Sequence, residues 1–581
     1  MSDRPPRPRS WSRAELGFEP QRPVDWFAPR VLASAALRVL LSDAFGTYAD
    51  KREIQAALPA AAPTDLGDRP ELWIDYVADL GDGFAATYTI ASLLAEPKLD
   101  LGVPGEAPHP TRRGEVLVMG GDQVYPTASS ARYADRLVGP YRAALPWTEV
   151  DHPRLFAVPG NHDWYDGLTS FMRLFCQPGW IGGRVTGQSR SYFALRLPHR
   201  WWLWGIDIQF DTYVDAPQLR YFDQVVGPLL RPGDAIVLCT AKPSWVAAER
   251  DPEAYANLDY FERKVIRPRG AQVRLALSGD SHHYARYRQV DGDGQRITAG
   301  GGGAYLSATH RLPAELELPP AASTDPGKTT PPTRYRLAAA YPDQAVSRRL
   351  GRGVASLPRR SPGLVVVLGA FQALCAWGLY GAVHLPGQGA AEVLPRLTPA
   401  EVALGLPRSP LALALCALLT VVLVDFTKAR SRSRGLAVGG THAAAQLALV
   451  VAGVWTAARL LSSVGAPWFA FGFAAVVTVA GGLAATLLLA AYLWLADHAG
   501  CNGNELFSAM ANPDYKNFLR LHLGADGALT VYPVGVDRTC RDWRLRQAGE
   551  PGDPWFEPAG EPPRPHLIEP PVRVTLAGGP R

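Results

Sequence analysis

Four apolar runs between residues 71 and 310 each end in small residues followed by Asp, Asn or His. The runs and the polar residues after them are Ile74–Ala78 before Asp79, Val116–Met119 before Asp122, Leu155–Val158 before Asn161 and His162, and Leu275–Ser278 before Asp280 and His282. Short continuous apolar runs of this kind predict buried β-strands. Loops at the carboxyl ends of strands are where an α/β sheet presents its chemistry, so we expect the four loops to form one site.

Other runs complete the predicted sheet. Ser191–Leu197 and Trp201–Asp207 lie close enough in sequence for an antiparallel hairpin, and Ala235–Thr240 is a further strand-like run. Apolar positions at helical spacing between Trp26 and Leu58 predict one or two amphipathic helices. The alternation of strands with helices and loops predicts an α/β fold with a mixed sheet in a layered domain.

After residue 362 the chain changes to long apolar stretches that lack charged residues. Four transmembrane helices are expected, at about 363–385, 407–426, 436–458 and 467–496. The second has the shortest apolar core and also suits a buried or re-entrant helix. Beyond these stretches, Asp526-Gly527 predicts a hairpin turn between two strand-like runs.

Basic residues flank the apolar stretches unevenly. Five arginines between residues 348 and 360 precede the first stretch, and Lys428, Arg430, Arg432 and Arg434 lie between the second and third. Basic loops remain on the cytoplasmic side, and the first 24 residues lack the apolar core of a signal peptide. We therefore expect a multi-pass protein of a bacterial inner (plasma) membrane with both termini in the cytoplasm.

The composition shifts divide the chain into six expected segments. These are a disordered tail (1–25), the α/β domain (26–312), a Pro-, Ala- and Arg-rich linker (313–362), the transmembrane region (363–497), a cytoplasmic C-terminal segment that docks on the α/β domain (498–548), and a Pro-rich tail (549–581).

Charge and cysteine content exclude some classes of protein. A net charge of +5 over 581 residues does not indicate a nucleic-acid-binding protein. The six cysteines are scattered without a CxxC pair, which predicts reduced thiols and argues against a disulfide framework or a zinc-binding cysteine cluster.

The four loops carry motifs that resemble a known family. Asp79 in DLG, Asp122 in GDQVY, Asn161-His162 in GNHD and His282 in GDSHHYAR are similar, in order and spacing, to the motifs of the calcineurin-like metallophosphoesterases. They resemble most the purple-acid-phosphatase branch, over roughly residues 71–310. The resemblance implies a four-layer α/β/β/α sandwich. It also implies a centre of two divalent or mixed-valence metal ions (Mn, Fe or Zn) at the strand ends.

The resemblance assigns a role to each matching residue. It implies that Asp79 and His282 bind the first metal, Asp122 bridges both, Asn161 binds the second, Tyr125 takes the place of a tyrosine ligand, and His162 lies beside the phosphate. There His162 would protonate the leaving oxygen or stabilise the charge that develops on it.

The chain departs from the family pattern at three places. Asp280 replaces the first His of GHxH, and Asp is a competent but harder ligand. Ala241 stands where the family has an isolated His, which leaves the second metal with few ligands. The first motif lacks the His of the common DxH form. Asp82, His283 and His310 are candidate additional ligands. For the two histidines the alternative is that they contact ligand residues without binding a metal, or lie at the surface.

These motifs and apolar stretches predict a membrane-anchored, metal-dependent phosphoric ester hydrolase. Attack of a metal-bound water would hydrolyse a phosphomonoester or phosphodiester. The expected partners are the lipid bilayer and a phosphoester substrate, either lipid-linked or soluble. The alternative is a degenerate phosphoesterase that serves as a membrane-bound binding or regulatory module without turnover. A transporter would need charged residues inside the spans, and the sequence places no charged pair there.

Overall fold

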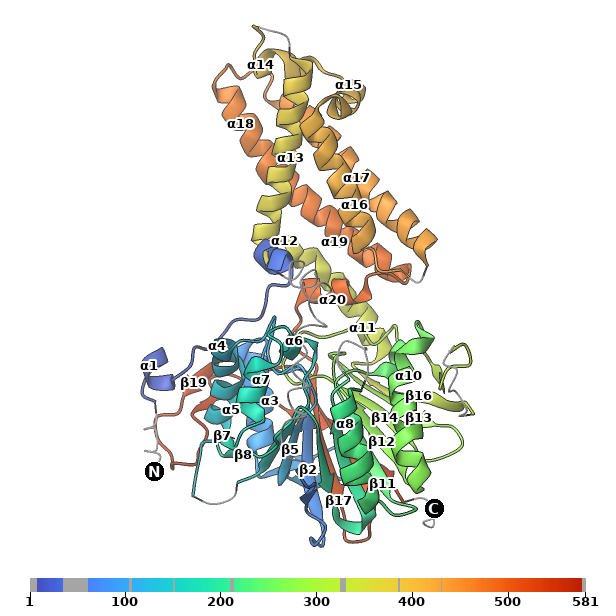
Figure 1. The fold of residues 1–581 in the computed structure, drawn as a ribbon. Helices are drawn as coiled ribbons and strands as arrows, with labels where there is room; N and C mark the ends of the chain where they lie inside the picture. Colours follow the sequence, from blue (N-terminus) through green and yellow to red (C-terminus); the bar gives the residue numbers. More distant parts are fainter. Residues whose placement is uncertain are drawn as a thin grey trace. The chain divides into compact units, whose positions relative to one another are not determined.

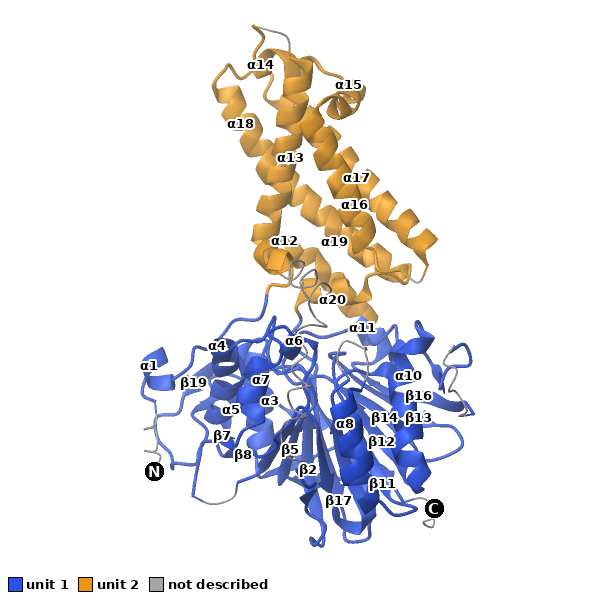
Figure 2. Cartoon of the chain, in the orientation of Figure 1, with its two compact units in different colours: residues 1–24, 38–347, 512–581 blue, residues 25–37, 348–511 orange. Residues whose placement is uncertain are grey.

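The chain forms two compact units, which the computed structural model describes over residues 8–34, 61–103, 107–149, 152–208, 214–323, 331–384, 387–429 and 431–576. The α/β unit comprises Met1–Val24, Arg38–Ser347 and Asn512–Arg581, and the helical unit comprises Asp25–Leu37 and Arg348–Ala511 (Figure 2). The helical unit is therefore inserted into the α/β unit. Most of the amphipathic region predicted between Trp26 and Leu58 lies outside the described residues.

The first large sheet of the α/β unit combines strands from both sides of the insertion. Its order is β21 (Pro565–Leu567), β18 (Leu529–Val536), β17 (Lys516–Leu523), β2 (Leu72–Val77), β5 (Val116–Met119), β6 (Arg154–Ala157), β8 (Arg184–Thr186) and β7 (Gly179–Ile181), and β22 (Val572–Val574) also pairs with β18. β2, β5, β6 and β8 are parallel, whereas β17 runs antiparallel to β2 (Figure 1). The predicted hairpin at Asp526-Gly527 is confirmed by the pairing of β17 with β18.

The second large sheet uses only strands that precede the insertion. Its order is β1 (Thr64–Asp65), β9 (Phe193–Arg196), β10 (Trp201–Ile206), β11 (Ala235–Thr240), β12 (Gln272–Ser278), β14 (Gln295–Ala299), β13 (Tyr284–Gln289), β16 (Thr333–Tyr341) and β15 (Glu315–Leu318). β10, β11, β12 and β14 are parallel. The antiparallel pairing of β9 with β10 confirms the hairpin predicted from residues 191–207.

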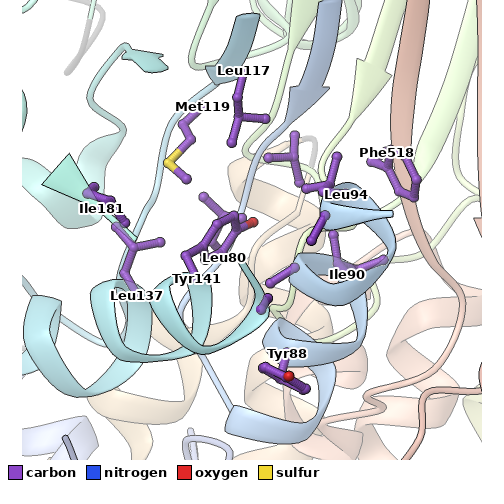
Figure 3. Packing of buried hydrophobic residues seen from close by; sticks show 14 of the residues in the cluster. Leu80, Tyr88, Ile90, Leu94, Leu117, Met119, Leu137, Tyr141, Ile181 and Phe518 are labelled. Carbon is purple, nitrogen blue, oxygen red and sulfur yellow. The ribbon is translucent and has the colours of Figure 1, made fainter. Parts of the chain in front are cut away.

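The two sheets share one hydrophobic cluster, and helices cover their other faces. Leu519 and Leu521 of β17 belong to the shared cluster together with Leu203 of β10. Phe518 points the opposite way, because side chains alternate along a strand, and packs with α3 (Phe84–Ala95), α5 (Gly139–Ala144) and α7 (Thr169–Phe175). Figure 3 shows Phe518 near Ile90 and Leu94 of α3. α8 (Ala216–Arg220) and α10 (Ala256–Phe261) pack on the second sheet.

The mixed α/β class predicted from the sequence is confirmed, as is the helical region that follows it. That the arrangement is the sandwich of the metallophosphoesterases stays a prediction.

Three segments expected to lack regular structure contain strands or a helix. The expected linker, 313–362, contains β15 and β16, and β16 pairs with β13. The expected C-terminal tail contains β20 (Phe556–Pro558), β21 and β22, and the N-terminal tail contains α1 (Arg13–Leu16). Composition misled in each case, because burial of a few apolar side chains such as Leu16, Tyr335 and Phe556 outweighs the many prolines and arginines around them.

Within the described residues of the helical unit, three stretches are long and apolar enough to cross a membrane. The unit's described α-helices after residue 350 are α12 (Leu357–Arg360), α13 (Pro362–Val383), α14 (Ala390–Val393), α15 (Pro399–Gly405), α16 (Pro410–Phe426), α17 (Arg432–Leu460), α18 (Trp468–Val476), α19 (Gly482–His498) and α20 (Gly503–Met510). The three stretches are α13, α17 and Trp468–His498. α16, joined to Pro399–Arg408 across a bend of 94°, makes a fourth if that pair counts as one span.

The two ends of the insertion lie close together in the α/β unit. Thr309 N–H donates a hydrogen bond to Ser347 Oγ (3.1 Å), and Leu306 N–H donates to the Asn512 carbonyl (2.9 Å). The last residue before the insertion and the first after it therefore contact the same short stretch of chain. Hydrogen bonds within the α/β unit hold these two ends, so the helical unit is not needed to keep them together.

Replacing residues 348–511 by a short Gly/Ser linker is expected to leave a folded α/β unit. A chain that stops after Ser347 is expected not to fold, because it lacks β17 and β18 and so uncovers both faces of the first sheet. Circular dichroism and the cooperativity of thermal unfolding would compare the two chains. Loss of cooperative unfolding in both chains would contradict the prediction that the α/β unit folds without residues 348–511.

Candidate metal and phosphate site

The four predicted loops meet at one edge of the α/β unit. Asp79 N–H donates to the Gly121 carbonyl (3.0 Å) and Leu80 N–H to the Asp122 carbonyl (2.9 Å), which joins the loops after β2 and β5. Asp280 N–H, after β12, donates to both carboxylate oxygens of Asp79 at 2.9 and 3.1 Å. Loops from both sheets are thus joined by direct hydrogen bonds.

The Tyr125 hydroxyl lies at the centre of three predicted metal ligands. It is 2.8 Å from Asp79 Oδ1, 3.2 Å from Asp122 Oδ2 and 3.0 Å from His282 Nε2. All four side chains are buried. A phenol has one hydrogen to donate. In each of the other two contacts the proton must therefore belong to the partner, either a carboxyl group or His282 Nε2.

Burial and mutual repulsion make these carboxylates costly to ionise. Burial raises the pKa of Asp79 well above its usual value, and the charges of Asp122 and Asp280 raise it further. Burial and the charge of Asp280 raise the pKa of Asp122 to about 8. A cation at this position would reverse the penalty, because it favours the charged form of each carboxylate.

Three of the aspartates adopt a backbone conformation that L-residues rarely occupy. Their φ angles are 59° at Asp79, 50° at Asp122 and 66° at Asp280. Non-glycine residues with positive φ store strain and cluster at functional sites. The same unusual conformation at three strand ends turns three carboxylates toward one another.

The loop after β6 is fixed to the loop after β5. His162 N–H donates to Asp122 Oδ1 (2.8 Å), and His162 Nδ1 lies 2.7 Å from the Pro126 carbonyl. Because a carbonyl only accepts, Nδ1 carries the hydrogen, and any proton that His162 gives or takes in a reaction must move at Nε2. Burial lowers the pKa of His162 to about 4, so the ring is neutral at pH 7.

Asn161 leaves a buried oxygen without a partner. Its Oδ1 accepts no hydrogen bond from any of the described residues. An unpaired buried amide oxygen is unfavourable, and oxygen is the preferred ligand atom of hard cations.

Asp163, which directly follows His162, holds two of the loops in place. Its carboxylate accepts hydrogen bonds from Gly160 N–H (2.8 Å), Gln123 N–H (3.3 Å) and the Tyr133 hydroxyl. It therefore links GNHD to GDQVY and positions the residues beside it, rather than facing the site itself.

The glycine run 300–303 lets backbone approach the site residues closely. A Cβ on Gly300 would lie 2.4 Å from Asp79 Oδ2, and one on Gly301 would lie 2.2 Å from Asn517 Nδ2. Gly302 N–H donates to the Ala78 carbonyl (2.8 Å). The run packs against chain segments of the site, which explains why side chains are excluded there.

Two further residues near the site, Lys516 and Asn517 at the start of β17, were not predicted from the sequence. Both are fully buried, and the charge of Lys516 contributes with burial to a lowered pKa of His282. No motif marks them, and they follow Asp79 by more than 400 positions.

Two of the three additional candidate ligands, Asp82 and His310, have other partners. Asp82 Oδ1 accepts a hydrogen bond from Val24 N–H (2.6 Å), and His310 Nδ1 lies 2.8 Å from Ser347 Oγ. His283 is buried beside His282, and burial lowers its pKa to about 4. Ala241 lies against the site: a Cβ on Gly121 would come within 2.9 Å of its methyl group.

The side-chain atoms at this site are of the kinds that bind a divalent cation, but they surround a hydroxyl group in this structure. Carboxylate oxygens, an imidazole nitrogen and an unpaired amide oxygen are ligands for Mn, Fe or Zn ions. Across the part of the chain that the structure describes, no three His, Cys, Asp or Glu side chains form a ready metal-binding group. Instead, the Tyr125 hydroxyl lies where the donors converge.

Comparisons with known proteins do not identify a family. No protein-family model matches the chain, and no curated protein matches it. Among solved structures, one described as "Structure of PhoD" aligns with 43% of this chain and 60% of its own, at 12% sequence identity and a TM-score of 0.26. A superposition of this quality does not establish a common fold.

Replacing Asp163 by Asn is expected to lower the free energy of unfolding by about 1–3 kcal/mol. The NH2 group of the new side chain would face backbone N–H donors and would find no acceptor. Denaturant unfolding of the purified chain would measure the loss. Asp166→Asn is the matched control, since Asp166 accepts one backbone bond from Ser170 N–H (3.1 Å) that an amide oxygen can also accept. Equal stability of the two variants would argue against the link between the loops.

Proposed function

We propose that this chain is a membrane-anchored, metal-dependent phosphoesterase. The observation that carries the proposal is the convergence of buried Asp79, Asp122 and His282 on one hydroxyl. Buried like charges without a counter-charge are unfavourable, so such a cluster has a physical reason to exist where cations bind. The motif resemblance supports the same interpretation.

The residues divide the expected work among them. Asp79, Asp122, His282 and the Asn161 amide oxygen would hold the cations, with Tyr125 and Asp280 beside them. Bound cations would lower the pKa of a water molecule and neutralise charge on the phosphoryl oxygens. His162 is fixed through Nδ1, so its Nε2 would hold or move a proton at the ester oxygen.

The substrate is a phosphomonoester or phosphodiester. An anchored site lies close to the bilayer, which favours a lipid-linked ester over a soluble one. Nucleic acid is not an expected partner, because the net charge is low.

The competing function is a binding or regulatory module without turnover. It is favoured by Ala241, which is buried against Gly121 and cannot bind a metal. Under this hypothesis the site binds one cation or none, and phosphate occupies it without being hydrolysed.

Hydrolysis of chromogenic phosphomonoesters and phosphodiesters by the purified chain is expected to require added Mn, Fe or Zn and to stop with a chelator. Asp122→Asn is expected to lower kcat/KM by roughly 100-fold or more, because it removes charge that holds the cations. The control is Asp526→Asn, a change in the exposed turn between β17 and β18. Absence of hydrolysis with all three metals would favour the binding module.

Strand pairing limits the number of membrane crossings. β2 precedes the long helical segment, residues 348–511, and β17 follows it, yet Leu519 pairs with Tyr76 in one sheet. Both ends of the insertion must therefore lie on one side of a membrane, so the number of complete crossings is even. Three long stretches are an odd number, and α16 supplies the fourth: its 17 residues span about 26 Å. We place both termini in the cytoplasm, as the basic flanks predict.

Short biotin-acceptor tags inserted in the loops would test the four crossings. Tags at Ser431 and after Arg581 are expected to be modified by a cytoplasmic biotin ligase, whereas tags at Gly389 and Gly465 are expected to be protected. Equal modification at Gly389 and Ser431 would show that α16 does not cross.

A further inference from the structure

β17 begins with two buried polar side chains that lack hydrogen-bond partners. Lys516 and Asn517 are both fully buried, and neither Lys516 Nζ nor the two amide atoms of Asn517 bonds to any described residue. Lysine is almost never fully buried unless it is paired. An ammonium group with three unused hydrogens in such a place is costly, and a ligand would relieve the cost.

Lys516 lies just beyond the part of β17 that pairs with β2. That pairing ends with Leu519 opposite Tyr76, so Lys516 and Asp79 each lie three residues beyond the last pair. At this end the glycine run enters between the two strands: Asn517 N–H donates to the Gly301 carbonyl (3.1 Å). Lys516 therefore begins its strand at the edge where the four loops meet.

The neighbouring carboxylates attract the ammonium group but are bonded to other groups. Asp79 accepts hydrogen bonds from Tyr125 and Asp280 N–H, and Asp82 accepts one from Val24 N–H. Burial lowers the pKa of Lys516 to about 8, and the charges of Asp514, Asp82 and Asp79 oppose that shift. A protonated Lys516 places a positive charge beside the site.

We propose that Lys516 binds the anionic oxygens of the substrate's phosphoryl group, and that the substrate is a phosphomonoester. This inference rests on the proposed function. An ammonium group donates up to three charge-assisted hydrogen bonds to phosphate oxygens. It adds positive charge to a site in which Ala241 provides no ligand for a second cation. A monoester carries close to two negative charges at neutral pH, against one for a diester, so the added charge favours the monoester.

The proposal makes the segment after the helical unit part of the site. Lys516 is the fifth residue of the final part of the α/β unit, which begins at Asn512. Chains that lack this segment therefore lose a phosphate-binding group as well as two strands.

The test compares wild type, Lys516→Met, Lys516→Arg and the control Lys264→Met, in which an exposed lysine is changed. One measurement is the shift of the unfolding temperature of the Mn-loaded full chain by inorganic phosphate. The other is KM for a chromogenic monoester and a diester. Lys516→Met is expected to abolish the phosphate-induced shift and to raise the monoester KM by roughly tenfold or more, with a smaller rise for the diester. Lys516→Arg is expected to restore part of both, and Lys264→Met to change neither.

The two proposals fail in different ways. Hydrolysis by wild type with an unchanged KM and phosphate shift in Lys516→Met would overturn the role of Lys516 and leave the phosphoesterase intact. A Lys516-dependent phosphate shift without hydrolysis would support the role of Lys516 in a binding module. If Lys516→Met does not fold, the Lys516→Arg variant decides. Arginine has a longer, forked side chain, so a contact that depends on the shape of lysine should change. A phosphate-induced shift and a monoester-to-diester KM ratio equal to those of wild type would therefore count against direct contact between Lys516 and phosphate.

Discussion

The pairing of β17 with β2 is the interaction on which the rest of the α/β unit depends. It joins segments separated by more than 400 residues, among them residues 348–511 of the helical unit. Arg520 and Asp75 form a buried ion pair across this pairing, with Arg520 Nε 3.3 Å from Asp75 Oδ1, and Arg520 also donates to the Glu96 carbonyl (2.9 Å). Loss of one partner of a buried charge pair strongly destabilises a fold. The parts of the α/β unit before and after residues 348–511 therefore require each other.

Three features follow from that pairing. It covers both faces of the first sheet, through Phe518 on the helix side and Leu519 between the sheets. In the proposed membrane topology, it requires both ends of residues 348–511 to lie on one side of the membrane. It also brings Lys516 to the edge of the sheet where Asp79, Asp122 and His282 meet. A second constraint acts on the site. Its buried carboxylates repel one another when ionised, and only protons or cations can offset that repulsion.

Much of the α/β unit could be predicted from local pattern. The apolar runs at β2, β5, β6, β10, β11 and β12 are strands, and their short continuous form is that of strands buried on both faces. The hairpins β9–β10 and β17–β18 follow from the spacing of their runs and the Asp526-Gly527 turn. Asp79, Asp122 and His282 could be placed together because parallel strands end at one edge.

What the sequence could not show was long-range pairing and local burial. β16 has the composition of a linker, and only its pairing with β13 makes it a strand. Lys516 resembles any lysine at the start of a strand, because its burial depends on a partner strand chosen by tertiary structure. The hydrogen bond from Val24 N–H to Asp82 likewise lies beyond any local signal.

The most direct test of the central claim is the metal content of the purified full-length chain, measured by elemental mass spectrometry beside Asp122→Ala. The proposed site predicts at least one tightly bound Mn, Fe or Zn ion per wild-type chain and a marked loss of metal in the variant. A wild-type chain that carries no metal and gains none on incubation with these ions, while remaining folded, would contradict the proposal.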